Sequence, residues 1–500
     1  MESKIKQLKG LLAEVADLGK IGALLDWDQQ TYMPPGASGS RSYQMATLAR
    51  LAHLKFTSDE IGKLLDDLHL YGQQLDPDSD DARLIQVTKR QYDKQTKVTP
   101  QWVADFAQTT VLAHNVWVEA RAADDFSKFQ PLLEKIVTLR QQYASFFAPY
   151  DHIYDPLLDD FEPGLKTADV KAIFKALRPQ QVELIKMIAG CPQVDDSFLH
   201  QEFDPQKQWD FGVEVITKFG YDWNHGRQDK APHPFTTNFG LDDVRITTRI
   251  QPNYLGTCLF GTMHECGHAL YELGVDPRLD RSPLSGGASL GVHESQSRMW
   301  ENLVGRSLPF WKHFYPRLQS IFPAQLGNVD LWTFYKGINR VKPSLIRVEA
   351  DEATYNLHIM LRLEIEIALM EGTLAVADLP EAWNNRMQDY LGLSPSNNAD
   401  GVLQDVHWSG GMIGYFSTYA LGNLISAQWW EVISKDIPNL PEQFEQGEYG
   451  ALLSWLREKI HQHGSKFKPQ ELVERVTGSR INPDPYMRYL RDKFTAIYGL

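Results

Sequence analysis

Apolar residues recur at three- and four-residue steps along the N-terminal segment, which is the pattern of an amphipathic helix. The repeating positions are Leu8, Leu11, Leu12, Val15, Leu18, Ile21 and Leu25. The pattern breaks near Met33-Pro34-Pro35-Gly36, where we expect this helix to end. The same periodicity predicts further helices over 58–75, 99–124, 128–147, 166–190 and 205–219.

The pattern changes beyond residue 220, where Gly, Pro, Thr and His become frequent. Residues 244–250 alternate with a period of two and are the best strand candidate. One face would carry Val244, Ile246, Thr248 and Ile250, and the other Arg245, Thr247 and Arg249. Because this strand precedes the metal-binding motif described below, its polar face could line a cleft.

Helical patterning returns after residue 310 and runs to the C-terminus, with loops at 392–400 and 409–414. We find no internal repeat and no low-complexity linker. The sequence therefore predicts a mainly α fold with one large helical domain over 1–500.

Segment 255–273 carries His264-Glu265-Cys266-Gly267-His268 on a predicted helix. The four-residue spacing places His264 and His268 on one side of that helix, where both imidazoles can hold one metal ion. Glu265 stands beside them and can polarise a bound water molecule. A chance match on a core helix is the alternative, and it is rare in a chain of this length.

A catalytic metal ion needs a third protein ligand and an open position for water. Glu294 lies near the start of the next predicted helix and is the candidate. His293 competes with it, but would face away if Glu294 faces the metal. A helix-start acid favoured by the macrodipole is the other interpretation of Glu294. We expect one zinc ion per chain, which cobalt or manganese could replace because this ligand set suits several divalent metals.

Charge and cysteine content narrow the function. A net charge of −14 argues against nucleic acid and anionic membranes as partners. Cys191, Cys258 and Cys266 are too few, and odd in number, for a disulfide framework, which favours a reducing compartment. The N-terminal segment has charged residues throughout and no apolar run typical of a signal or membrane segment. We therefore expect a cytoplasmic protein.

Further short motifs accompany the metal-binding elements. They are Asp26-Trp27-Asp28-Gln29 with Thr31-Tyr32-Met33-Pro34-Pro35-Gly36, His233-Pro234-Phe235, Asp243-Val244-Arg245-Ile246-Thr247, Ile346-Arg347-Val348-Glu349-Ala350-Asp351 and Gly401-Val402-Leu403-Gln404-Asp405-Val406-His407-Trp408. Because these motifs occur together and in this order, the chain resembles the carboxypeptidase Taq family of metallocarboxypeptidases. Ser417 departs from the proline that the family usually has at this position.

The resemblance implies a predominantly helical fold in which a deep substrate cleft would divide the domain into two lobes. It also implies a small β-sheet near the metal, similar to neurolysin and angiotensin-converting enzyme. A homodimer is implied as well. Members of the family release single amino acids from peptides with a free C-terminal carboxylate, with broad side-chain tolerance and usually sparing proline.

Peptide hydrolysis needs an activated water, a stabilised oxyanion and a proton for the leaving amine. Glu265 is expected to act first as the general base that accepts a proton from the water, and later as the general acid that delivers it to the leaving nitrogen. His407 and Tyr415 resemble the His and Tyr that related helical gluzincins aim at the scissile carbonyl. Tyr419 rivals Tyr415, and a packed core histidine is the alternative for His407.

An exopeptidase also needs a cation for the terminal carboxylate. Arg347, which lies in a family motif, is the favoured candidate, and Arg245 is the second. The alternative for Arg347 is a surface ion pair with Asp351, four residues later on a helix. Asp405 could orient His407 or a metal ligand, or cap a helix, and Trp27 is expected to pack rather than bind.

Two other functions use the same residues. An endo-acting oligopeptidase would have the same metal site and lack only the carboxylate-binding cation. A helical binding scaffold with a structural zinc would need four protein ligands, and Glu265 between the two histidines would then have no purpose.

Overall fold

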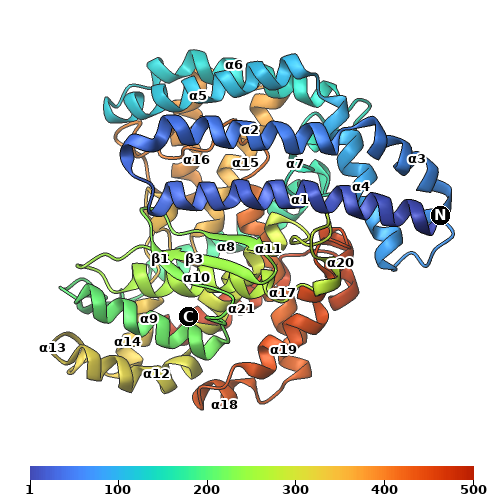
Figure 1. The fold of residues 1–500 in the computed structure, drawn as a ribbon. Coiled ribbons are helices and arrows are strands. Elements are labelled where there is room, and N and C mark those ends of the chain that lie inside the picture. Colours follow the sequence, from blue (N-terminus) through green and yellow to red (C-terminus); the bar gives the residue numbers. More distant parts are fainter.

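The computed structural model describes residues 1–500 and confirms a mainly helical fold with one small sheet (Figure 1). The N-terminal helices are α1 (Glu2–Thr31), α2 (Ser38–Phe56), α3 (Asp59–Gly72), α4 (Asp80–Lys97), α5 (Pro100–Ala122), α6 (Phe126–Ser145), α7 (Asp155–Leu158), α8 (Thr167–Ala189) and α9 (Pro205–Phe219). The middle of the chain holds β1 (Gln228–Lys230), β2 (Thr236–Gly240), β3 (Asp243–Thr248), α10 (Gly256–Glu272) and α11 (Leu290–Arg298). The C-terminal helices are α12 (Leu308–Ile321), α13 (Pro323–Leu326), α14 (Leu331–Ile338), α15 (Tyr355–Glu371), α16 (Leu379–Leu391), α17 (Ser417–Asp436), α18 (Leu440–Glu445), α19 (Gly450–Lys459), α20 (Pro469–Thr477) and α21 (Asp484–Tyr498).

Besides the four-residue helix α7, the periodicity did not predict α2 and α4. In α2 only Phe56 is buried, so the helix has no continuous apolar stripe to detect. The buried residues of α4 all lie in its first half and include Arg83 and Thr88. Both helices are held by contacts with neighbours rather than by a regular apolar face.

The sheet has the strand order β1-β3-β2, with β1 parallel and β2 antiparallel to β3. The predicted strand at 244–250 is real but ends at Thr248. The expected polar face is wrong in part, because Thr247 is fully buried and bonds to the Phe235 backbone, while Arg249 lies beyond the strand. Of the three residues expected on that face, only Arg245 both lies in the strand and is partly exposed.

The large core surrounds α15 and α17, two helices that are buried over most of their length. Helix α11 lies between α10 and α17 at very short range. A Cβ atom at Gly267 of α10 would meet Gln296 of α11 at 2.7 Å, and one at Gly422 of α17 would meet Glu294 at 2.6 Å. These two glycines let three helices approach closely enough to share one site.

A smaller apolar cluster, which we call the N-terminal core, lies apart from the large one. It consists of Ile5, Leu8, Leu12, Phe56, Ile61, Leu64, Leu65, Leu68, Leu84, Ile85, Val275, Leu279 and Leu284. The last three belong to the loop that follows α10. In Figure 1, α1 and α2 run side by side, and α1 also packs on β2. The N-terminal helices are thus tied to the sheet and to the loop after α10.

None of the helices is both long and apolar enough to cross a membrane.

Replacing Leu65 by Ala should destabilise the N-terminal core by about 2–5 kcal/mol, because Leu65 is fully buried there and truncation leaves a cavity. Hydrogen exchange should rise in α1, α3 and α4 and stay unchanged in α15 and α17, since the two cores are separate. The control is Leu70→Ala, at a side chain that is 69% exposed. A uniform rise over the whole chain would show that the two cores unfold as one.

Candidate metal centre

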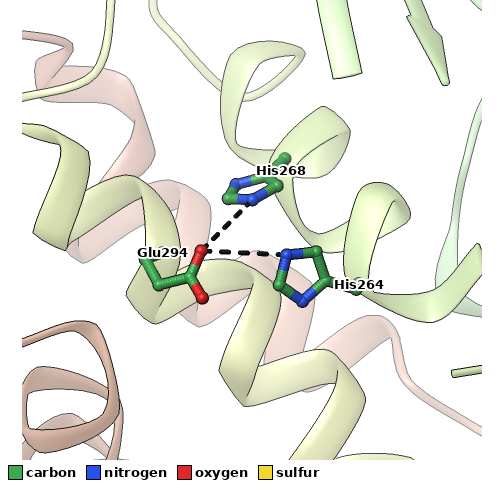
Figure 2. Close-up of side chains that lie close together, drawn as sticks. All are labelled: His264, His268 and Glu294. Atoms are coloured by element: carbon green, nitrogen blue, oxygen red, sulfur yellow. Dashed lines mark ion pairs between the residues drawn. The ribbon is translucent and has the colours of Figure 1, made fainter. Parts of the chain in front are cut away.

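Helices α10 and α11 bring His264, His268 and Glu294 together (Figure 2). The Glu294 carboxylate Oε2 lies 3.7 Å from His264 Nε2 and 3.6 Å from His268 Nε2. One ligand atom from each residue lies within 4.8 Å of the other two. The four-residue step on α10 aligns the imidazoles, and α11 supplies the carboxylate from the opposite side.

These three residues fit a catalytic divalent metal. Ligand atoms about 2.0–2.2 Å from a tetrahedral zinc ion lie roughly 3.4 Å apart, close to the two distances found between the Glu294 carboxylate and the imidazoles. Two imidazoles and one carboxylate are a ligand set used by catalytic zinc sites, and they leave one position for water. The same donors also suit cobalt or manganese.

Glu265 is buried directly beside these ligands, and burial raises its carboxyl pKa. Thr236 of β2 donates a 2.7 Å hydrogen bond from Oγ1 to Glu265 Oε2. The same hydroxyl lies 2.9 Å from the Glu265 backbone oxygen. The sheet therefore orients the carboxylate, a role of Thr236 that the sequence analysis missed because only tertiary packing brings β2 to α10.

Two charged side chains, Arg298 and Glu301, contact the proposed ligands. Arg298 donates to Glu294 Oε1 at 2.7 Å and to Glu301 Oε2 at 3.2 Å. Glu301 also lies 2.9 Å from His264 Nδ1. Burial alone would raise the pKa of Glu301, but Arg298 and the bond to His264 lower it to about 2. The spacing of 294, 298 and 301 on one helical side is a pattern that sequence analysis could have used.

His293 does not point toward the three ligand atoms. Its Nδ1 lies 2.7 Å from His268 Nδ1, and its Nε2 lies 2.6 Å from Glu272 Oε1. The structure therefore places His293 behind His268, while its neighbour Glu294 faces the metal position, as expected if only one of the two is a ligand.

His407, Tyr415 and Tyr419 form an aromatic cluster at the start of α17. The His407 ring centroid lies 5.3 Å from that of Tyr415, and its Nε2 is 3.4 Å from the Tyr419 hydroxyl. Burial raises the pKa of Tyr415; the contact with Tyr419 opposes this effect, and the charge of Glu294 adds to it. Burial lowers the pKa of His407 to about 4, against the opposing charge of Asp405.

Arg347 lies beside this cluster, with its guanidinium 5.0 Å from the Tyr419 ring centroid. It donates to Asp405 Oδ1 at 3.0 Å and to the Tyr355 hydroxyl at 2.9 Å. The alternative interpretation of Arg347, a surface ion pair with Asp351, is wrong, because Arg347 pairs with Asp405 instead. Arg347 is buried in a short 3-10 turn (Arg347–Glu349), so the helical spacing of four does not apply.

Asp405 is the shared counter-ion of two arginines. Besides Arg347, it accepts from Arg362 Nε at 2.7 Å. These two positive charges hold the Asp405 pKa far below its usual value although burial opposes them. Asp405 Oδ1 lies 3.9 Å from His407 Nδ1, too far for a hydrogen bond, so its close contacts orient Arg347 rather than His407.

Arg245 contacts a different set of residues. Its guanidinium lies 4.6 Å from the Trp27 ring centroid and 4.7 Å from that of Phe239, and it forms a bidentate pair with Asp243. Trp27 is buried, in agreement with the packing role expected for it. The structure therefore groups Arg347, and not Arg245, with His407 and Tyr419.

Comparison with known sequences gives one consistent relationship. A family model described as carboxypeptidase Taq (M32) metallopeptidase matches residues 7–494. Thermostable carboxypeptidase 1 from Thermus thermophilus is 42% identical over 508 residues, which cover 100% of this chain and 99% of that protein. Carboxypeptidase 1 from Bacillus subtilis is 37% identical over 496 residues, 99% of each chain.

Solved structures agree with the sequence relatives. The crystal structure of an M32 carboxypeptidase from Deinococcus radiodurans matches with a TM-score of 0.96 at 40% identity and covers 100% of both chains. A Pyrococcus furiosus carboxypeptidase structure matches with a TM-score of 0.94 at 36% identity, over 98% of this chain and 99% of that one. The resemblance seen in the motifs is confirmed: the chain belongs to the carboxypeptidase Taq (M32) family of metallopeptidases and is a peptide-bond hydrolase.

Proposed function

We propose that this protein is a zinc-dependent carboxypeptidase that removes single amino acids from the free C-terminus of peptides. The observation that carries this proposal is the convergence of His264, His268 and Glu294 around a buried Glu265. The names of its relatives support the carboxypeptidase activity. Broad side-chain tolerance and poor release of proline are proposed from the family resemblance.

His264, His268 and Glu294 would hold the zinc ion, with Glu301 and Arg298 fixing two of these ligands. When bound, zinc supplies a Lewis acid that polarises the scissile carbonyl and lowers the pKa of water. The Glu265 carboxylate accepts the water's proton and passes it to the leaving nitrogen. Because Thr236 donates to Oε2, the other Glu265 oxygen stays available for that proton.

Two side chains are suited to stabilise the oxyanion. His407 has a lowered pKa and is neutral near pH 7, so it can donate one hydrogen bond. The phenol of Tyr415 can donate another, since its raised pKa keeps it protonated. We assign Tyr419 a supporting role, because it lies between His407 and Arg347. Donors fixed before the reaction stabilise developing charge without reorganising.

Arg347 is the proposed anchor for the terminal carboxylate. Its Nε and Nη1 are held by Asp405 and Tyr355, which fixes the guanidinium plane and leaves Nη2 for an incoming oxygen. Arg245 is less suitable, because Asp243 occupies its Nε and Nη2 in a bidentate pair and its guanidinium packs on Trp27 rather than on Tyr419. This choice separates a carboxypeptidase from an oligopeptidase, which needs no such cation.

The homodimer and the cytoplasmic location remain predictions from the family resemblance and the composition. The three cysteines, Cys191, Cys258 and Cys266, are free in the structure.

Replacing Glu265 by Gln should lower kcat roughly 10²–10⁴-fold, because the amide cannot accept a proton. The zinc content should stay at the wild-type level, since Glu265 is not a proposed ligand. Steady-state kinetics and elemental analysis of the same preparation check both statements. Near-normal kcat with full metal occupancy would remove Glu265 from the base role.

Replacing Arg347 by Met should lower kcat/KM on free-acid peptides roughly 10–100-fold, the worth of a hydrogen bond to a charged group. The matched variant Arg245→Met should change it by less than about threefold, because Arg245 bonds only to Asp243. Paired assays on free-acid and C-terminally amidated peptides test this. Cleavage of both peptides, or a larger loss in Arg245→Met, would contradict the assignment.

The neutral state of His407 predicts a pH dependence of stability. Its folded pKa of about 4 lies below the ordinary value near 6.5, so protons bind the unfolded chain more readily. The stabilising contribution is complete above pH 6.5 and is lost as the pH falls toward 4. Between pH 7 and pH 5 the wild type should lose more unfolding free energy than the His407→Gln variant, by on the order of 1–2 kcal/mol.

Urea unfolding at several pH values measures this difference. His200→Gln is the control, because the His200 side chain is 53% exposed. Identical pH slopes in wild type and His407→Gln would show that His407 is not buried in its neutral form.

A further inference from the structure

The two proposed histidine ligands have different supports on their far nitrogens. Behind His264 stands a carboxylate, Glu301, at 2.9 Å from Nδ1. Behind His268 stands a second imidazole, His293, whose Nδ1 is 2.7 Å from His268 Nδ1. Glu272 follows at 2.6 Å from His293 Nε2. The second ligand is therefore connected to its carboxylate through an intervening histidine.

The positions of the nitrogens define the protons in this chain. His268 turns Nε2 toward Glu294 and the metal position, so its Nδ1 must carry the hydrogen. That N–H donates to His293 Nδ1, which accepts only if the His293 proton is on Nε2. The Nε2–H of His293 then donates to Glu272 Oε1, while Asn238 donates to Glu272 Oε2 at 2.7 Å. Each donor in the chain has one acceptor.

Close packing fixes His293 in this place. The Tyr271 ring centroid is 5.0 Å from that of His293. A Cβ atom at Gly287 would lie only 2.8 Å from the His293 ring, so the loop before α11 closes directly over it. His293 also immediately precedes Glu294. One turn of α11 thus supplies a metal ligand and the support of another ligand.

We propose that His293 and Glu272 are positioning residues that hold His268 in its Nε2-ligating tautomer and raise the metal affinity of the site. Neither side chain belongs to the group of three proposed ligands. Hydrogen-bond partners of this kind orient ligating imidazoles, and their loss typically lowers metal affinity about 10–100-fold. The inference rests on the proposed metal site and is independent of the substrate.

The test is the zinc affinity of the full-length protein, measured without substrate by competition with a chromophoric chelator. His293→Leu should weaken zinc binding about 10–100-fold. His293→Gln should recover much of this loss, because an amide can accept from His268 and donate to Glu272. The matched control is His461→Leu: His461 is buried against the same Tyr271 ring but bonds to Gln296. It should bind zinc like wild type.

A second variant guards against misfolding of His293→Leu. Glu272→Gln keeps the size of the side chain and should weaken zinc binding several-fold, because a neutral amide oxygen is a poorer acceptor. Thermal unfolding of the metal-free variants and the visible spectrum of the cobalt-loaded forms show whether the fold persists and whether the ligand geometry has changed.

Unchanged zinc affinity in a folded His293→Leu or in Glu272→Gln would overturn the proposal, as would an equal loss in His461→Leu. Failure of the proposed function is a separate result. A wild type that binds zinc but cleaves no peptide would contradict the carboxypeptidase, while the order of zinc affinities among the variants would still decide the role of His293.

Discussion

The close approach of three helices is the constraint on which the site depends. Helix α11 fits between α10 and α17 because Gly267 and Gly422 leave no side chain in the way. At this distance Glu294 can face the two histidines of α10, and the start of α17 brings Tyr415 near Glu294. A side chain at either glycine would push α11 outward and separate the carboxylate from the imidazoles.

Such a compact site concentrates charge in the interior, and the protein neutralises it by pairing. Arg298 lies between the carboxylates of Glu294 and Glu301, and Asp405 lies between Arg347 and Arg362. Unpaired charges in these places would be strongly destabilising. The same pairs fix the orientation of groups that we propose act on the substrate, because a guanidinium held on two sides cannot turn away. The buried ion pairs therefore both stabilise the folded chain and position the side chains of the site.

The sequence predicted those features that depend on local spacing. The step from His264 to His268 and the placement of Glu294 on a following helix predicted three residues that the structure brings together as a possible metal site, and the amphipathic pattern located α9 with its observed bounds. It failed where distant segments meet. Thr236, Glu272 and Arg362 gain their roles from contacts that no spacing along the chain reveals. The helix expected at Arg347 is a short 3-10 turn, so the four-residue spacing to Asp351 did not predict a contact. Helix α2 was missed since almost none of its side chains are buried.

The most direct test is a time course on metal-stripped protein titrated with zinc, using one free-acid peptide and mass spectrometry of the products. We predict no cleavage without metal, full activity at one zinc per chain, and a ladder of products shortened by one residue at a time from the C-terminus. Internal fragments, or cleavage that persists without any divalent metal, would contradict a zinc carboxypeptidase built on His264, His268 and Glu294.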